Sequence, residues 1–275
     1  MRIAIIGLGE AGATYAAALV AAGHQVVACD PTPAATPPGV ERAANVAECV
    51  TDADAVLVLT GASAAPAVAA QAQGSLAANA VYADFTSSSP NVMAQIAEQL
   101  QQDNVRFVDV AILGPVPLFG AHVPLMVAGT GGEELAEILK PLGAKVDVLD
   151  GAPGAAMAHK LLRSVFMKGL ASVVCEAVAA GQAAGYEQWI RGQIAELIAG
   201  DGQAVIDRFL SGTRTHAVRR AQEMADTGAY LADLQVPSEM TAATERSLRR
   251  LAEESQRQAD PKSNGVLQHA TENVS

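Results

Sequence analysis

Short apolar runs alternate with helical segments over roughly the first 150 residues of the chain. The runs are rich in β-branched residues, as expected for strands buried on both faces. They lie at residues 2–6, 25–29, 55–59, 81–83, 107–111, 124–128 and 145–149, with a weaker strand near Val40. Helical patterns lie between them at 11–22, 90–100 and 133–139. This alternation predicts an α/β fold with a Rossmann-type, doubly wound and mainly parallel sheet.

The pattern changes near residue 153, where strands give way to helices. Residues 154–184 form a nearly unbroken helical pattern without proline, and a helix of that length would run roughly 45 Å. Helical periodicity then continues to about 254, with breaks expected at 200–202, 211–212 and 236–238. We therefore predict a dinucleotide-binding domain over 1–152, an all-helical domain for substrate binding and dimerisation over 153–255, and a flexible tail over 256–275.

Composition and charge exclude several classes of function. Half of the residues are hydrophobic and the net charge is −11, which argues against nucleic acids and anionic membrane surfaces as partners. The three cysteines lie far apart and no Cys-x-x-Cys occurs, so we expect neither a disulfide framework nor a metal site. Because no eighteen-residue apolar span lacks charges and glycines, we expect a cytoplasmic protein that does not cross a membrane.

A glycine-rich motif, Gly-Leu-Gly-Glu-Ala-Gly at 7–12, joins the first strand to the first helix. Gly7 permits a tight turn, Gly9 lets a pyrophosphate approach the backbone, and Gly12 lets the helix lie close to the strand. The amino terminus of the helix would supply free N–H groups to the phosphates. The strand before and the helix after make this motif more specific than three glycines alone.

Asp30 ends the second strand, eighteen residues after Gly12. A carboxylate there can accept hydrogen bonds from the adenosine ribose and would repel a 2′-phosphate, so NAD is favoured over NADP. Residues 31–33 supply no Arg or Lys to hold that phosphate. The alternative is that Asp30 only opens a turn before proline.

Other polar or small residues follow the remaining strands and would meet at the same edge of the sheet. The residues assigned to the cofactor are Gly7, Leu8, Gly9, Glu10, Ala11, Gly12, Asp30, Thr60, Gly61, Ala62 and Thr86. Ser87, Ser88, Gly114 and Pro115 are assigned to the substrate. Ser88 or Ser89 can also cap the helix that begins at Pro90, and a capped helix start still presents hydroxyls to a ligand.

Lys160 lies just inside the long helix, where that helix would face the crevice. A lysine on such a helix is usually a solvated charge, but beside a cofactor it can transfer a proton to a substrate oxygen. Ser164, one turn further on, could bind the same substrate. Arg163 would bind an anion or pair with an acidic residue.

Together these residues resemble the β-hydroxyacid dehydrogenase superfamily, which includes 6-phosphogluconate and 3-hydroxyisobutyrate dehydrogenases. The matching segments are the glycine motif at 7–12, Asp-Phe-Thr-Ser at 84–87, the loop at 109–116 and Gly154 to Lys160. The resemblance covers residues 1 to about 180 and implies that Lys160 is the catalytic general acid and base. It also implies a homodimer and catalytic positions at Ser87 and Ser164.

The sequence departs from that family at two positions: Ser164 replaces the usual asparagine, and Pro115 replaces a glycine of the substrate loop. The segment at 209–224 resembles a poorly characterised, phosphogluconate-dehydrogenase-like branch. His216, Arg219 and Arg220 lie there at helical spacing, with Arg214 just ahead and with His216 and Arg220 on one face. They would form either a clamp for a substrate anion or a solvated, ion-paired helix face.

The sequence therefore predicts an NAD-dependent dehydrogenase that transfers hydride between the cofactor and a small anionic hydroxy acid. A sugar-acid oxidoisomerase or a keto or imine reductase on the same scaffold is one alternative. A non-catalytic NAD-binding sensor is another.

Overall fold

The computed structural model describes residues 1–32 and 35–259 and divides into two compact units. The first unit comprises Met1–Ser164, and the second begins at Val165. The long helix predicted at 154–184 is helix α7 (Ala155–Ala183). The predicted domain boundary at 152 therefore lies just before α7, whereas the compact units divide within that helix.

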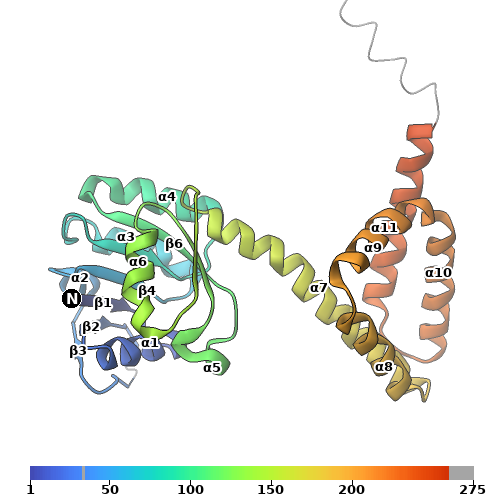
Figure 1. Cartoon of the computed structure of the whole chain (residues 1–275), viewed down its shortest axis with the longest axis horizontal. Helices are drawn as coiled ribbons and strands as arrows, with labels where there is room; N and C mark the ends of the chain where they lie inside the picture. The colour runs from blue at the N-terminus through green and yellow to red at the C-terminus, as the bar shows by residue number, and fades with distance from the viewer. Residues whose placement is uncertain (33–34, 260–275) are drawn as a thin grey trace, which may run out of the picture. The chain divides into compact units, whose positions relative to one another are not determined.

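Within the described residues of the first unit, eight strands form one sheet in the order β3-β2-β1-β4-β5-β6-β7-β8 (Figure 1). All neighbouring strands are parallel except β6 and β7, which are antiparallel. The strand order reverses between β1 and β4, so the carboxyl ends of β1, β2, β4, β5 and β6 share one edge. The strands are β1 (Arg2–Ile6), β2 (Gln25–Cys29), β3 (Val40–Arg42), β4 (Ala55–Val58), β5 (Val81–Asp84), β6 (Arg106–Ile112), β7 (Leu125–Ala128) and β8 (Val146–Leu149).

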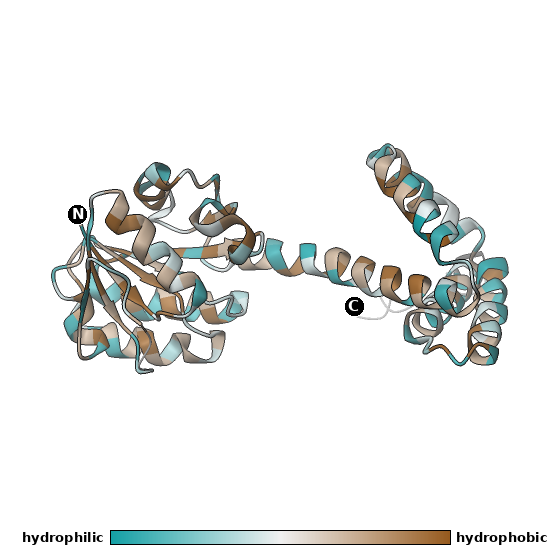
Figure 2. Ribbon diagram, turned by 90° about the horizontal axis from the view of Figure 1, so that it is seen from below, coloured by the Kyte–Doolittle hydropathy of each residue, from teal (hydrophilic) through white to brown (hydrophobic). Residues whose placement is uncertain are grey.

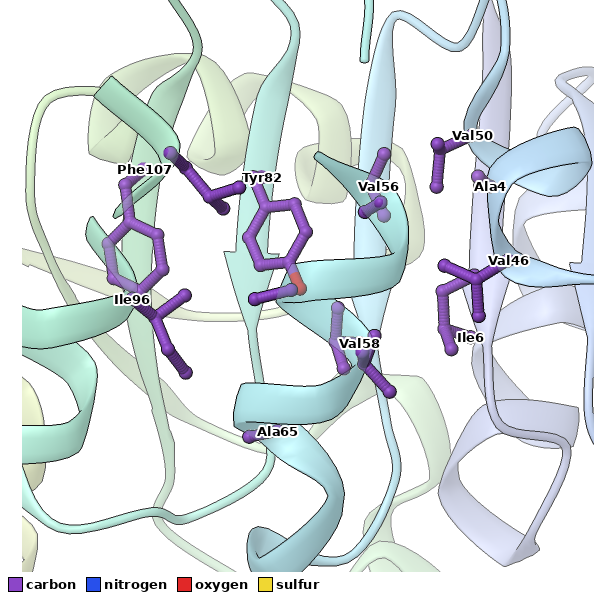
Figure 3. Close-up of a cluster of buried hydrophobic side chains, with 14 of the residues drawn as sticks. Ala4, Ile6, Val46, Val50, Val56, Val58, Ala65, Tyr82, Ile96 and Phe107 are labelled. Carbon is purple, nitrogen blue, oxygen red and sulfur yellow. The ribbon is translucent and has the colours of Figure 1, made fainter. Parts of the chain in front are cut away.

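Helices cover both faces of this sheet because alternate strand residues point into two separate apolar clusters. One cluster takes Ile3 and Ile5 and packs against α1 (Glu10–Ala21), α5 (Val116–Phe119) and α6 (Gly132–Leu139). The other takes Ala4 and Ile6 and packs against α2 (Val46–Val50), α3 (Ala65–Ala72), α4 (Pro90–Leu100) and the first turn of α7. Figure 3 shows this second cluster, where the rings of Tyr82 and Phe107 stack with centroids 6.0 Å apart.

Short single-turn helices complete the connections of the first unit: η1 (Ala62–Ala64), η2 (Gln101–Asp103), η3 (Gly120–His122) and η4 (Lys140–Leu142). Ser89 caps α4, since its hydroxyl accepts a hydrogen bond from Val92 N–H at 3.4 Å. Gly23 ends the turn after α1 with a φ of +86°, the left-handed conformation that glycine adopts most readily. The predicted mainly parallel, doubly wound Rossmann-type fold is therefore confirmed.

The second unit is helical throughout its described residues. It contains the remainder of α7 and four further helices, α8 (Glu187–Ala199), α9 (Gly202–Thr215), α10 (Ala217–Asp233) and α11 (Glu239–Ala259). The Glu176 carboxylate on α7 accepts hydrogen bonds from the amides of Met240 and Thr241 at 2.7 and 2.8 Å. These bonds join α7 to the first turn of α11. Burial would raise the pKa of Glu176, but a bond from the Thr241 hydroxyl at 2.6 Å and these two amide bonds outweigh it and lower that pKa.

Two of the predicted helix boundaries are wrong. Helix α9 continues through the expected break at 211–212, because an interior glycine costs a helix only about 1 kcal/mol and Ser211 is held by a bond to the Asp207 carbonyl. The chain breaks at His216 instead. Helix α11 continues to Ala259, beyond the predicted start of the tail, and the rest of that tail, 260–275, lies outside the described residues.

Much of α7 is apolar, as Figure 2 shows along its length, and several of its large side chains are exposed. Leu162, Val165 and Phe166 are 71, 76 and 64 % exposed. By length and composition alone, α7 could cross a membrane, with a mean hydropathy of 1.4 over its most apolar window. Charges and glycines such as Lys168 and Gly169 interrupt the helix, so the expectation that no eighteen-residue apolar span lacks them still holds.

Candidate cofactor and active site

The glycine-rich turn between β1 and α1 leaves little room for side chains at two positions and open space at the third. Gly7 has a φ of +98°, and its N–H donates to the Cys29 carbonyl at 2.8 Å. A Cβ on Gly12 would lie 1.9 Å from the Gly7 carbonyl oxygen. A Cβ on Gly9 would meet nothing within 4 Å, so an approaching group can reach the backbone there. This is the geometry that close contact with a phosphate requires.

Asp30 lies directly beside this turn. Its carboxylate accepts hydrogen bonds from Leu8 N–H at 2.6 Å and Thr32 N–H at 2.7 Å. Burial alone would raise the pKa of Asp30, but these bonds and the nearby Arg42 guanidinium outweigh it and lower that pKa. Asp30 is therefore ionised at neutral pH and attached to the glycine-rich turn.

Arg42, on the edge strand β3, is a residue that sequence reasoning missed. Its guanidinium donates to the carbonyls of Asp30 and Thr32 at 2.6 and 3.0 Å. In the sequence, only residues 31–33 were considered as a source of positive charge near Asp30. Parallel pairing of β2 with β3 places Arg42 opposite Ala28, near the end of β2 that leads into Asp30. Only the prediction of a strand near Val40 could have drawn attention to it.

The loop after β5 is held by its own polar side chains. Asp84 accepts a hydrogen bond from Thr86 N–H at 2.8 Å, and the hydroxyls of Thr86 and Ser88 lie 2.8 Å apart. Ser88 also donates to the Ala62 carbonyl at 3.1 Å, which connects this loop to the end of β4. Ser87 has a φ of +61° and is exposed. A left-handed backbone is uncommon for serine, and such strain often occurs at functional sites.

Lys160 meets Ser87 although the two residues are 73 positions apart. The Lys160 ammonium donates to the Ser87 hydroxyl at 2.6 Å. Lys160 lies on α7, whose first turn is attached to the sheet because the Asp109 carboxylate accepts a bond from Met157 N–H at 3.1 Å. The start of α7 also lies against α4, since a Cβ on Gly154 would be 2.5 Å from the Pro90 carbonyl.

The structure thus brings most of the predicted site residues to one edge of the sheet. The glycine-rich turn contacts Asp30, and Ala62, the loop at 84–89 and Lys160 are joined by the contacts above. The two groups are neighbours, since a Cβ on Gly7 would lie 3.0 Å from Thr60 Cγ2, and Gly114 and Pro115 follow β6 at the same edge. Among the described residues, no hydrogen bond joins Arg163 or Ser164 to this group. No cluster of metal-ligating side chains occurs in the same described part of the chain.

Arg214, His216 and Arg220 lie in the second unit and do not share one helix. Arg214 is in the last turn of α9, Arg220 is in α10, and exposed His216 separates the two helices. His216 is the N-cap of α10, and its carbonyl accepts a hydrogen bond from Arg220 N–H at 3.0 Å, so these two residues lie one turn apart as predicted, whereas Arg214 lies on a separate helix. The Arg220 guanidinium donates to Thr213 Oγ1 at 2.9 Å, which holds the two helices together.

A cavity of about 680 Å³ lies at the opposite, amino-terminal edge of the sheet. Its walls include Asp54, Asn79, Arg106 and Glu134. Arg106 pairs with Glu134 and donates to the Asn79 carbonyl at 2.9 Å, so its charge is already satisfied. This cavity contains none of the predicted site residues.

Comparison with known proteins matches both units. Residues 2–151 match the NAD binding domain of 6-phosphogluconate dehydrogenase, and residues 182–251 match a domain of unknown function, DUF1932. A conserved hypothetical protein from Sinorhizobium meliloti 1021, solved by crystallography, is 30 % identical, with 97 % of this chain and 91 % of that chain covered and a TM-score of 0.61.

Two further proteins are more distant. An imine reductase from Streptomyces aurantiacus is 21 % identical, with 91 % of this chain and 94 % of that chain covered and a TM-score of 0.76, which shows a common fold. An uncharacterised 28.5 kDa protein from Methanothermus fervidus is 23 % identical over 176 residues, or 63 % of this chain. The match spans 66 % of that curated relative's length.

Proposed function

Because the chain belongs to the family defined by the NAD binding domain of 6-phosphogluconate dehydrogenase, we propose that it is an NAD-dependent dehydrogenase acting on a small hydroxy acid. The observation that carries this proposal is the contact of Lys160 with Ser87 at 2.6 Å, at the sheet edge that also holds the glycine-rich turn. A proton-transferring group beside a dinucleotide site is what hydride transfer from an alcohol requires.

The residues present fit a dinucleotide. Open space at Gly9 and the amino terminus of α1 would accept the pyrophosphate, and ionised Asp30 would accept hydrogen bonds from the adenosine ribose. The nicotinamide, when bound, supplies the acceptor or donor of the hydride. Thr60, Gly61, Ala62 and Thr86 belong to the same edge and would line the cofactor.

NAD is favoured over NADP because of the charge at Asp30. A carboxylate at the ribose would repel a 2′-phosphate, and its lowered pKa keeps it ionised. Arg42 lies close by, but its guanidinium donates to the backbone carbonyls of Asp30 and Thr32. It therefore shapes the loop that presents the carboxylate.

Lys160 would take the proton from the substrate hydroxyl during oxidation and return it during reduction. Ser87, already a hydrogen-bond acceptor for Lys160, would hold the same hydroxyl in line, and Ser164 lies one turn further along α7. Arg163 and the amides near Gly114 would orient the substrate and its anionic group. Ser88 is buried and its hydroxyl donates to the Ala62 carbonyl, so we assign it to holding the loop. Each of these assignments is a proposal for mutagenesis.

The test is a fluorescence titration with NADH and NADPH, followed by a turnover screen of β-hydroxy acids and sugar acids. We expect tighter binding of NADH, oxidation of at least one hydroxy acid, and loss of the NADH preference in Asp30→Ala. Tighter NADPH binding by the wild-type protein would overturn the argument from Asp30. NADH binding without turnover on any acid or imine would favour a sensor.

Imine reduction is the second candidate, because the solved imine reductase has the same fold over most of both chains. The same screen separates the two activities if it includes a cyclic imine and NADH. If the protein reduced the imine and oxidised no hydroxy acid, we would conclude that it is an imine reductase. A sugar-acid oxidoisomerase would instead convert one sugar acid into an isomer, with no net oxidation of the sugar acid.

We further propose that a second copy of the chain covers the exposed apolar residues of α7. The first turn of this helix packs in the core of the first unit, where Ala156 and Met157 are 0 and 1 % exposed. The apolar residues that follow it are therefore the part of the helix that a partner could cover. Exposed Leu162, Val165 and Phe166 would lose contact with water on pairing. Analytical ultracentrifugation is expected to give twice the chain mass, and a monomer at micromolar concentration would contradict this.

A further inference from the structure

Two aspartates lie side by side in the interior of the first unit. Asp84 on β5 is the register partner of Asp109 on β6, so both side chains leave the same face of a parallel pair. Both residues have no exposed surface. Two buried carboxylates on neighbouring strands, roughly 5 Å apart at the backbone, repel each other strongly if both are ionised.

Each carboxyl group uses one oxygen and leaves the other without a partner. Asp84 Oδ1 accepts from Thr86 N–H at 2.8 Å, and Asp109 Oδ2 accepts from Met157 N–H at 3.1 Å. Asp84 Oδ2 and Asp109 Oδ1 are buried and have no hydrogen-bond partner. Among the described residues, neither carboxyl group has a salt-bridge partner.

The surroundings of the pair are apolar apart from the hydroxyls of Thr86 and Tyr82. The flanking strands contribute Val58 beside Asp84 and Ala128 beside Asp109. Helices α4 and α7 contribute buried Met93, Ile96, Ala156 and Met157 to this face. Tyr82, two residues before Asp84, is the titratable neighbour on β5, and its hydroxyl is buried without a partner.

We propose that Asp84 and Asp109 share one proton, with Asp84 as the donor and Asp109 as the acceptor, and that this pair positions Lys160 against Ser87. A bond from Asp84 Oδ2–H to Asp109 Oδ1 satisfies both unpaired oxygens at once. The charge stays on Asp109 because that carboxylate faces the amino terminus of α7, where the amides of Gly154, Ala156 and Met157 are directed at it.

Burial raises the pKa of both carboxyl groups, and that of Asp109 reaches about 6. A carboxyl group whose pKa is raised in the folded state stabilises the protein in its neutral form. That stability is fully present below the ordinary aspartate pKa and is lost as pH rises through the raised pKa. The pair therefore holds the shared proton under mildly acidic conditions and loses it as pH rises past about 6.

The pair connects the two segments that meet at the candidate active site. Asp84 holds the loop that carries Ser87, through Thr86 N–H. Asp109 holds the first turn of α7, one turn before Lys160, through Met157 N–H. Loss of the shared proton would leave two facing anions between these segments, so the Lys160–Ser87 contact would loosen. This functional part of the inference rests on the proposed function.

Infrared spectroscopy of the full chain tests the shared proton without any need for activity. At pH about 5.5, where an ordinary aspartate is ionised, we expect the carbonyl band of a buried, protonated carboxylic acid. The band should disappear in Asp84→Asn and persist in Asp147→Asn, an exposed aspartate on β8, and in Tyr82→Phe. Absence of the band in the wild-type protein from pH 5 upward would overturn the proposal. Loss of the band in Asp109→Asn together with its persistence in Asp84→Asn would overturn the assignment of the donor.

The positioning function is tested by comparing two variants of Asp84 in turnover and in thermal unfolding. Asp84→Ala leaves Asp109 Oδ1 unsatisfied, and we expect kcat to fall about tenfold with little change in NADH affinity. Asp84→Asn can donate an N–H to that oxygen, so it should recover most of this turnover and remove the loss of thermal stability between pH 5 and 8. Equal turnover in the Ala and Asn variants, or an unchanged pH profile in Asp84→Asn, would overturn the positioning function. If the protein has no turnover at all, the infrared band and the unfolding profile still decide the shared proton.

Discussion

Replacement of Lys160 by methionine is expected to lower kcat by about 10² to 10⁴-fold, the usual contribution of a positioned general acid or base. Methionine retains the length and most of the apolar volume of the lysine side chain but cannot exchange a proton. Lys160 donates to Ser87 across the gap between α7 and the β5 loop, so the variant also loses the bond that holds Ser87. The measurements are steady-state turnover on the substrate found in the screen and fluorescence titration with NADH.

NADH affinity should change little in Lys160→Met, because the glycine-rich turn follows β1 and Asp30 follows β2, whereas Lys160 lies on α7 and contacts the β5 loop. Lys168→Met is the matched control, since Lys168 is an exposed lysine on the same helix. Lys160→Arg tests the chemistry more sharply, because a guanidinium keeps the charge but does not give up its proton near neutral pH. Turnover by Lys160→Arg within a few-fold of the wild type would mean that the residue acts as a charge.

Most of the fold could be predicted from the sequence because the central strands are buried on both faces. Val56 and Val81 lie in short runs with no charged residue, which few structures other than a covered parallel sheet accept. The observed strands begin and end within one or two residues of the predicted ones. Glycine at 7, 9 and 12 then fixed the position of the first turn.

The helical half was predicted less well, since helix boundaries depend on local energies that nearly cancel. Gly212 was read as a break, but a glycine inside a helix costs only about 1 kcal/mol, and packing on neighbouring helices offsets that. His216 carries no breaking signal of its own, yet the chain turns there. The same uncertainty placed Arg214 and Arg220 on one helix.

The candidate site was predicted in its residues but not in its supporting contacts. The motif at 84–87 and the position of Lys160 indicated that both belong to one site, and the structure joins them. Nothing in the sequence indicated that Ser87 has a left-handed backbone or that Arg42 holds the loop after Asp30. Asp109 did carry a signal, because an aspartate in the middle of the apolar run 107–111 needs a buried partner.

Alanine at Gly9 and at Gly12 should separate cofactor binding from folding within one turn. A Cβ at Gly12 would lie 1.9 Å from the Gly7 carbonyl oxygen, which is backbone and cannot move aside. Gly12→Ala must therefore displace α1 from β1, and overpacking of this kind costs about 1–3 kcal/mol or more. We expect a clear fall in the unfolding midpoint, together with loss of NADH binding because the phosphate-facing end of α1 moves.

Gly9→Ala is expected to leave the unfolding midpoint within experimental error and still weaken NADH binding by about tenfold or more, equivalent to about 1.4 kcal/mol. Gly9 has φ −64° and ψ −170°, a conformation that alanine adopts without strain, and its added Cβ would meet no protein atom within 4 Å. The methyl group would instead occupy the space proposed for the pyrophosphate. Differential scanning calorimetry measures the unfolding midpoint of each variant, and titration measures its NADH affinity. The two decisive results are the NADH affinity of Gly9→Ala and the unfolding midpoint of Gly12→Ala. Unchanged NADH affinity in a stable Gly9→Ala protein would show that the cofactor does not bind at this turn. An unchanged unfolding midpoint in Gly12→Ala would show that the turn is looser than its backbone contacts imply.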